Sequence, residues 1–144
     1  MEATINTIIP KYGLGKIKFG MGTGELLDIL NNPDDIEQIE FEEGVFGENW
    51  HYDKLGLSFL FEPFDELQIS SVSVSEKDFL FDGKSLIGKT KPEILEFLTK
   101  MFPELDLSPE LEEGDELILV NEEGLYFWFE DDKLSEIQWE VLPD

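Results

Sequence analysis

The feature that most constrains this chain is an internal repeat. The sequence aligns with itself without a gap at an offset of 68 residues, which places residues 15–62 on residues 83–130. The two segments share eleven identities when two further Glu matches, Glu42/Glu110 and Glu48/Glu116, are set aside because the chain is rich in Glu. Unrelated segments of this length share roughly three at average residue usage. The identical pairs are Gly15/Gly83, Lys16/Lys84, Gly20/Gly88, Glu25/Glu93, Leu27/Leu95, Leu30/Leu98, Gly56/Gly124, Leu57/Leu125, Phe59/Phe127, Phe61/Phe129 and Glu62/Glu130. We therefore treat residues 1–144 as one domain made of two repeats, 15–76 and 83–141.

Each repeat begins with a Gly-flanked turn and continues into a short helix. In the first repeat, Thr23 is a candidate N-cap, Glu25 lies near the positive end of the helix dipole, and apolar residues follow at helical spacing through Leu30. In the second repeat, Pro92 suits the first helical position and Pro103 ends the helical region.

After each helix the pattern changes to strands. The predicted strands are 49–53, 57–62 and 69–74 in the first repeat, and 116–121, 125–130 and 134–141 in the second. Gly56 and Gly124 close hairpin turns at positions that need positive φ, and residues 130–133 form a second tight turn. A helix followed by an antiparallel meander, repeated in tandem, predicts an α+β fold: one curved sheet with the helices on one face.

Comparison of the two aromatic strands separates a core face from a second face. Leu57, Phe59 and Phe61 are repeated in the second copy, which predicts that these positions pack under the helices. The alternate positions have diverged, and they are Ser58 and Leu60 in the first copy and Tyr126 and Trp128 in the second. Large aromatic residues on an open sheet face are typical of protein-binding surfaces. The alternative is that a terminal segment, such as residues 5–9, covers this face.

Two acidic segments are the other candidates for binding. Residues 37–48 are rich in Glu and hold Phe46 between Gly44 and Gly47, which suggests a flexible acidic loop with one exposed aromatic residue; the alternative places Phe46 in the core. The corresponding segment of the second repeat is also acidic. The predicted partner-binding residues are Glu40, Glu42, Glu43, Phe46, Glu48, Ser58, Leu60, Glu62, Glu112, Glu113, Asp115, Tyr126, Trp128 and Glu130.

Charge restricts the class of partner. The chain has 34 Asp and Glu against 10 Lys and Arg, a formal net charge of -24. Such a field repels nucleic acid and anionic membranes, whose binding requires Lys and Arg. It attracts basic proteins and accelerates their association. The alternative is that the acidity only keeps the protein soluble.

The sequence offers little for catalysis, metal binding or secretion. The one histidine, His51, lies in a predicted strand, and there is no cysteine, nucleophile elbow, EF-hand spacing or phosphate-binding loop. We therefore expect a protein that is not an enzyme and that needs no cofactor, metal or small-molecule substrate. Without disulfides, a signal-peptide pattern or a long apolar stretch, it is expected to be cytoplasmic.

The motif at residues 20–27, Gly-Met-Gly-Thr-x-Glu-Leu-Leu, is followed by a helix, an aromatic strand and a Gly turn. This pattern resembles the β-lactamase-inhibitor-protein-like architecture, and the second repeat keeps it as Gly88-Lys89-Thr90-x-Pro92-Glu93-Ile94-Leu95. The resemblance implies a concave sheet whose aromatic residues bind an enzyme. The chain lacks the cysteines of the secreted inhibitor and of the related lipoproteins. An acidic, intracellular binding protein is instead similar to immunity proteins that neutralise bacterial toxin domains, including those of contact-dependent growth inhibition.

Three functions follow from these observations. The first is an immunity protein that occludes a basic toxin domain, such as a nuclease, in a 1:1 complex. The second is a nucleic-acid mimic, in which carboxylates stand in for phosphates and binding weakens sharply with salt. The third is a homo-oligomeric scaffold in which the exposed sheet face pairs with itself.

Overall fold

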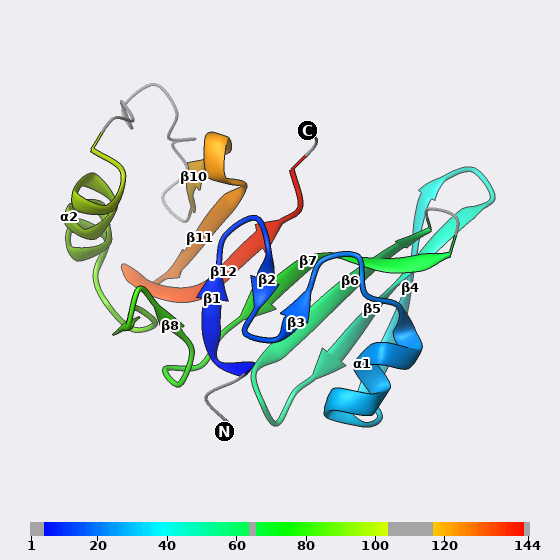
Figure 1. Cartoon of the computed structure of the whole chain (residues 1–144). Helices are drawn as coiled ribbons and strands as arrows, with labels where there is room; N and C mark the ends of the chain where they lie inside the picture. Colours follow the sequence, from blue (N-terminus) through cyan, green and yellow to red (C-terminus); the bar gives the residue numbers. More distant parts are fainter. Residues whose placement is uncertain (1–4, 64–65, 104–116, 143–144) are drawn as a thin grey trace.

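The computed structural model describes residues 5–63, 66–103 and 117–142. Seven strands form one antiparallel sheet in the order β10-β11-β12-β7-β6-β5-β4, so that both repeats contribute to it (Figure 1). The strands are β4 (Asp35–Glu42), β5 (Val45–Tyr52), β6 (Leu57–Pro63), β7 (Leu67–Val74), β10 (Leu117–Val120), β11 (Leu125–Glu130) and β12 (Lys133–Glu140). The two halves meet where β12 pairs with β7, with Trp139 opposite Val72.

A second sheet of five short strands has the order β3-β2-β1-β8-β9. Its members are β1 (Thr7–Ile9), β2 (Gly13–Leu14), β3 (Ile17–Lys18), β8 (Leu80–Phe81) and β9 (Lys84–Ser85). Strands β1 and β8 pair in parallel, with Thr7 opposite Leu80, and so join the beginning of the chain to its middle. The two described α-helices, α1 (Thr23–Leu30) and α2 (Lys91–Met101), flank this small sheet (Figure 1). A 3-10 helix, η2 (Asn121–Glu123), joins β10 to β11.

This architecture corrects the predicted fold class. The described chain is mostly β, with sheets of seven and five strands and short helices, so the prediction of an α+β fold with one curved sheet and the helices on one face is wrong. The small sheet covers the centre of the large one, because apolar residues of its short strands supply packing that we assigned to helices. Ile8, Leu14 and Ile17 from β1–β3 and Phe81 from β8 are all buried.

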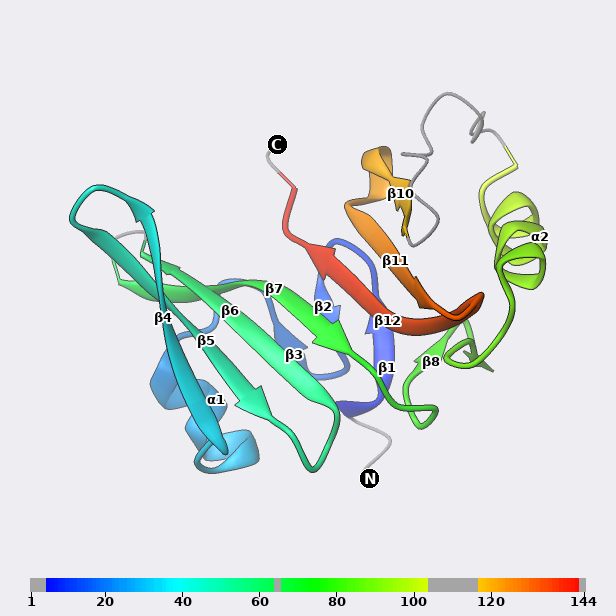
Figure 2. The ribbon, with the colours of Figure 1, turned by 180° about the vertical axis from the view of Figure 1, so that it is seen from behind.

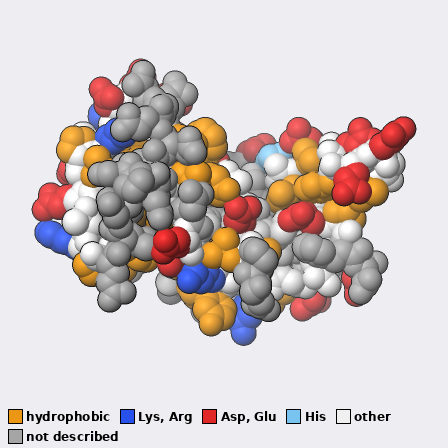
Figure 3. All heavy atoms as spheres, turned by 90° about the horizontal axis from the view of Figure 1, so that it is seen from above, with side chains coloured by type: hydrophobic (Ala, Val, Ile, Leu, Met, Phe, Trp, Pro, Cys, Tyr) orange, Lys and Arg blue, Asp and Glu red, His pale blue; other side chains and the backbone are white. Residues whose placement is uncertain are grey.

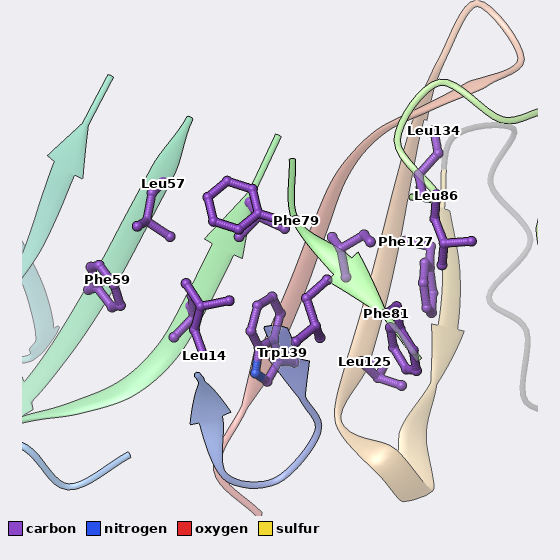
Figure 4. Close-up of a cluster of buried hydrophobic side chains, with 14 of the residues drawn as sticks. Leu14, Leu57, Phe59, Phe79, Phe81, Leu86, Leu125, Phe127, Leu134 and Trp139 are labelled. Carbon is purple, nitrogen blue, oxygen red and sulfur yellow. The ribbon is translucent and has the colours of Figure 1, made fainter. Parts of the chain in front are cut away.

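The core lies between the two sheets. Leu57, Phe59 and Phe61 are buried together with their repeat partners Leu125, Phe127 and Phe129, as the alternation predicts. Figure 4 shows these strands contributing side chains to one cluster with Leu14 and Trp139. Trp139 is fully buried, and its indole Nε1 donates a hydrogen bond of 2.9 Å to the carbonyl oxygen of Gly13, which ties the small sheet to the large one.

Equivalent glycines and helix N-termini of the two repeats have the same local geometry. Gly20 and Gly88 have φ of 95° and 94°, and Gly56 and Gly124 have φ of 68° and 65°, all of which favour glycine. Each helix is capped by a Glu: Oε1 of Glu25 accepts from the Gly22 N–H, and Oε1 of Glu93 accepts from the Thr90 N–H. The prediction of Thr23 as the first N-cap is wrong, because Gly22 is the N-cap of α1 and Thr23 is its first helical residue.

Candidate protein-binding face

The second face of the seven-stranded sheet is the first candidate site. Seen from behind, β4–β7 and β12 lie in front, with α1 and the small sheet behind them (Figure 2). Residues 5–9, which we considered as a cover for this face, lie instead with the small sheet on the core side. We call the second surface the open face. Backbone register carries one row of its residues across all seven strands: Asp35, His51, Ser58, Ser73, Gln138, Tyr126 and Leu119.

Hydrogen bonds between side chains hold the aromatic residues of the open face in place. The Tyr126 hydroxyl donates to Oε1 of Glu140 over 2.7 Å, and Trp128 Nε1 donates to Oε1 of Gln138 over 3.3 Å. Gln138 in turn donates from Nε2 to the Ser71 hydroxyl over 3.4 Å, which links β12 to β7. The hydrogen bond to Glu140, together with burial and the Glu140 charge, raises the pKa of Tyr126 to about 12. Tyr126 is therefore a hydrogen-bond donor at neutral pH.

The end of the open face at β10 and β11 is aromatic and apolar. Trp128 is opposite Leu117, and Tyr126 is opposite Leu119. Trp128 keeps 37% of its surface exposed although it lies in the middle of a strand. A large side chain with a polar edge and a fixed orientation is typical of residues that anchor protein interfaces.

The centre of the open face is polar. His51 Nδ1 lies 2.8 Å from the Ser58 hydroxyl oxygen, and its Nε2 lies 3.3 Å from Oε1 of Glu37. A shallow cavity of about 120 Å³ opens beside Ser58, Ser73 and Glu136. Burial raises the pKa of Glu136 above its ordinary value, and a hydrogen bond with Ser73 opposes that rise.

Glu136 predicts a pH dependence of stability. Its carboxyl group binds a proton more tightly in the folded protein than in the unfolded chain, so ionisation opposes folding as the pH rises through and above the ordinary value of 4.5. We expect Glu136→Gln to gain stability relative to the parent protein between pH 4 and pH 7, because glutamine does not ionise. Urea unfolding across this pH range measures the difference. A difference that is the same at every pH contradicts the prediction.

The acidic hairpin formed by β4 and β5 extends the sheet at its other end. Residues 19–53 contain ten Asp or Glu and no Lys or Arg. Acidic and hydrophobic side chains lie together at this end of the molecule, and the Lys side chains visible in the same view lie elsewhere (Figure 3). The exposed hydrophobic residues of the hairpin are Ile36, Phe41, Val45 and Phe46.

The hairpin corrects our prediction of a flexible loop at residues 37–48. These residues form most of two paired strands joined by a tight turn at Glu43 and Gly44, because seven pairs between Asp35–His51 and Glu42–Val45 define a ladder. Phe46 is 44% exposed rather than in the core. Oε2 of Glu40 accepts a hydrogen bond from the Gly44 N–H over 3.2 Å, so one of the carboxylates stabilises the turn.

The structure brings only part of the predicted site together. Strand alternation places Ser58, Leu60, Glu62, Tyr126, Trp128, Glu130 and Glu42 on the open face. It places Glu40, Phe46 and Glu48 on the other side of the sheet, where Oε1 of Glu48 accepts a 2.9 Å hydrogen bond from Trp50. Glu43 lies in the hairpin turn, whereas Glu112, Glu113 and Asp115 lie outside the described residues.

Comparisons with known proteins give one likeness of fold. No protein-family model matches the sequence, and a search of curated proteins found no match. The structure is similar to a solved extracellular protein containing an SCP domain from Bacillus anthracis str. Ames, with a TM-score of 0.55 and 17% sequence identity. The match covers 84% of this chain and 43% of the other. At this identity the likeness concerns the fold alone, and the resemblance to inhibitor and immunity proteins stays a prediction.

Several residues of the open face were not predicted from the sequence. Glu136, Gln138 and Glu140 contribute its polar network, and the alternation Glu136-Ile137-Gln138-Trp139-Glu140 contains the signal that places them there. A bulge obscures this signal, since Trp128 pairs with Glu136 while Phe129 pairs with Leu134, which leaves Ser135 as an extra residue. Glu37 was assigned to a loop, and only the strand pairing brings it to His51.

Within the described part of the chain, no cluster of three potential metal-binding side chains occurs. None of the described helices is long and apolar enough to cross a membrane.

Proposed function

We propose that this protein binds another protein through the open face, and that it is an immunity-type inhibitor that occludes a basic toxin domain in a 1:1 complex. The observation that carries the proposal is the pair Tyr126 and Trp128, which are held by hydrogen bonds on the open face of a strongly acidic protein. We place the protein in the cytoplasm as part of the same proposal.

The fixed orientation of the aromatic residues favours binding over a solvent-exposed structural role. Gln138 and Glu140 hold Trp128 and Tyr126 through their polar edges, so a partner that packs on the rings loses little additional side-chain entropy. Burial of Trp and Tyr in a partner's pocket contributes a large share of the affinity at many interfaces.

Charge favours a basic partner. Within the described residues, three lysines form ion pairs, Lys11 with Glu123, Lys89 with Glu93 and Lys100 with Glu96. None of these carboxylates belongs to the acidic hairpin, where Glu37 instead lies 3.3 Å from the His51 ring. A partner rich in Lys and Arg offsets this charge, and complementary fields raise the rate of its association.

To identify the partner, a lysate of the native cell is passed over the immobilised protein at physiological and at high salt. Mass spectrometry identifies the retained proteins, and light scattering gives the stoichiometry of the complex. The proposal expects one basic domain, retained at both salt concentrations in a 1:1 complex. Many nucleic-acid-binding proteins that are all released by salt indicate a nucleic-acid mimic instead. Self-association without a partner indicates a homo-oligomeric scaffold.

Substitution of Trp128 tests which surface is used. Trp128→Ala is expected to weaken binding of the captured domain by about 2 kcal/mol or more, roughly 30-fold in Kd, because the anchoring ring is lost. Tyr12→Ala is the matched control, since Tyr12 is 67% exposed but lies between β1 and β2 of the small sheet. Isothermal titration calorimetry measures both. Equal affinities of the two variants would place the interface elsewhere.

A further inference from the structure

The outer edge of β4 is unpaired in the described structure. β4 is the last strand of the seven-stranded sheet, and its inner side pairs with β5. All of its eight residues are exposed except Ile39, which is half-buried. A strand at a sheet edge offers its backbone groups to any extended chain that reaches it.

The hydrogen-bond pattern shows which backbone groups are free. The carbonyl oxygen of His51 accepts a 2.8 Å hydrogen bond from the Asp34 N–H, so the backbone groups of His51 point toward β4. Asp35 is paired with His51, and its own backbone groups therefore point toward β5. Because direction alternates along a strand, the N–H and C=O groups of Ile36, Gln38 and Glu40 point outward.

The side chains of β4 specify the chemistry of an added strand. Natural edge strands are commonly protected by Lys, Pro or a β-bulge. β4 contains neither Lys nor Pro, and its bulge lies between Glu40 and Glu42, beyond Ile36 and Gln38. It carries Asp35, Glu37, Glu40 and Glu42, and Ile36 lies between the first two with 50% of its surface exposed. Asp35 and Glu37 share the open face with His51, whereas Ile36 is opposite Trp50 and lies on the other side.

Charge decides between the occupants of this edge. A second copy paired through its own β4 would place two rows of carboxylates against each other, and like charges on adjacent strands are destabilising. An extended segment with Lys or Arg beside Asp35 and Glu37, and apolar residues beside Ile36, meets complementary groups on both faces of the sheet.

We infer that the outer edge of β4 accepts an extended basic segment of the partner as an added strand. This inference rests on the proposed function and names the part of the partner that binds here. Main-chain hydrogen bonds to Ile36, Gln38 and Glu40 provide affinity, and the alternating basic and apolar side chains provide selectivity.

A synthetic peptide of alternating Lys and Val, as long as the 8 residues of β4, is the probe. A second peptide has the same sequence with alternate backbone nitrogens methylated, which preserves its charge but removes donors from one edge. Fluorescence anisotropy is expected to show at least about tenfold weaker binding of the methylated peptide, since charge alone cannot replace strand pairing. Nuclear magnetic resonance is expected to show slowed amide exchange at Ile36 and Gln38 on addition of the unmodified peptide.

Gln38→Pro tests the same edge from the protein side. Proline at this position removes an outward N–H and no bond of the β4–β5 ladder, and Gln38→Thr is the control that keeps the N–H. We expect Gln38→Pro to lose at least about tenfold in peptide affinity and Gln38→Thr to bind as the parent does. If Gln38→Pro does not fold, the two peptides on the parent protein decide the question.

Equal binding of both peptides, or no saturable binding of either, overturns the inference. The inference is also overturned if the free protein forms a dimer in which the Ile36 and Gln38 amides are protected from hydrogen exchange, because a second copy then occupies the edge. These outcomes are separable from failure of the proposed function. If binding of the captured domain is weakened by Trp128→Ala but not by Gln38→Pro, the open-face interface is supported and only the added strand is contradicted.

Discussion

Replacing Trp139 by alanine is expected to lower the free energy of unfolding by about 4 kcal/mol. Trp139 is among the largest fully buried side chains, and it lies on β12 where the two halves of the large sheet join. Its removal leaves a cavity and deprives the buried Gly13 carbonyl oxygen of its 2.9 Å hydrogen bond. Both losses act at the contact between the small and large sheets.

Trp139→Phe separates the two contributions. Phenylalanine keeps most of the apolar ring but donates no hydrogen bond, so we expect a loss of about 1–3 kcal/mol from the missing hydrogen bond and the reduced volume. Urea unfolding followed by circular dichroism measures both variants. A loss below about 1 kcal/mol for Trp139→Ala would mean that the small sheet is not held to the large one through this residue.

Replacing Gly13 by alanine is expected to lower the free energy of unfolding by about 3 kcal/mol. Gly13 has φ of 144°, and a Cβ at this position would lie 2.1 Å from the Ile17 carbonyl oxygen and 3.0 Å from the Lys18 Cα. Both of these atoms belong to the backbone of β3 and cannot rotate away. The β2–β3 pair must therefore open to admit a methyl group, and the small sheet loses its edge.

Gly24→Ala is the matched control. Gly24 lies in α1, and a Cβ there would meet no atom within 4 Å. Alanine is the better helix former, so we expect Gly24→Ala to be neutral or to stabilise the protein by up to about 1 kcal/mol. Thermal unfolding of the two variants, together with hydrogen exchange in β1–β3, gives the comparison. Similar melting temperatures would contradict the proposed close approach of β2 and β3.

The core and the candidate site are linked within one strand. Gln138, Trp139 and Glu140 are consecutive, so the buried ring of Trp139 fixes the backbone that presents the two side chains on the open face. Those side chains accept the hydrogen bonds from Trp128 and Tyr126. Packing in the core thus positions the two side chains that hold Trp128 and Tyr126 in place on the open face.

Local signals allowed part of this molecule to be predicted. The strands at 57–62 and 125–130 were expected from alternation alone, and they occur as β6 and β11. The turn between β11 and β12 lies at Asp131 and Asp132, whose φ values of 52° and 65° suit a tight hairpin. Each of these features depends on residues that are close in the sequence, so a single chain contains enough information to predict them.

The small sheet could not be predicted in the same way. Its strands contain two or three residues each, too few for a period to be recognised. Their existence depends on the parallel pairing of Thr7 with Leu80, which lie far apart in the chain. Strand β4 was missed for another reason, because its carboxylates suggested a loop. An edge strand needs only one partner, and nearly all of its side chains remain in water.

By itself, the sequence determined the duplication, the glycine turns and the two faces of β6 and β11. These depend on backbone preferences and on short-range periodicity. Tertiary structure alone decided which strands became neighbours and in which register. The pairing of Ser73 with Gln138 across β7 and β12 brings His51 and Ser58 of one repeat into a row with Tyr126 of the other. Alternation assigns a residue to a face, but only the packing of the two sheets determines which face remains open.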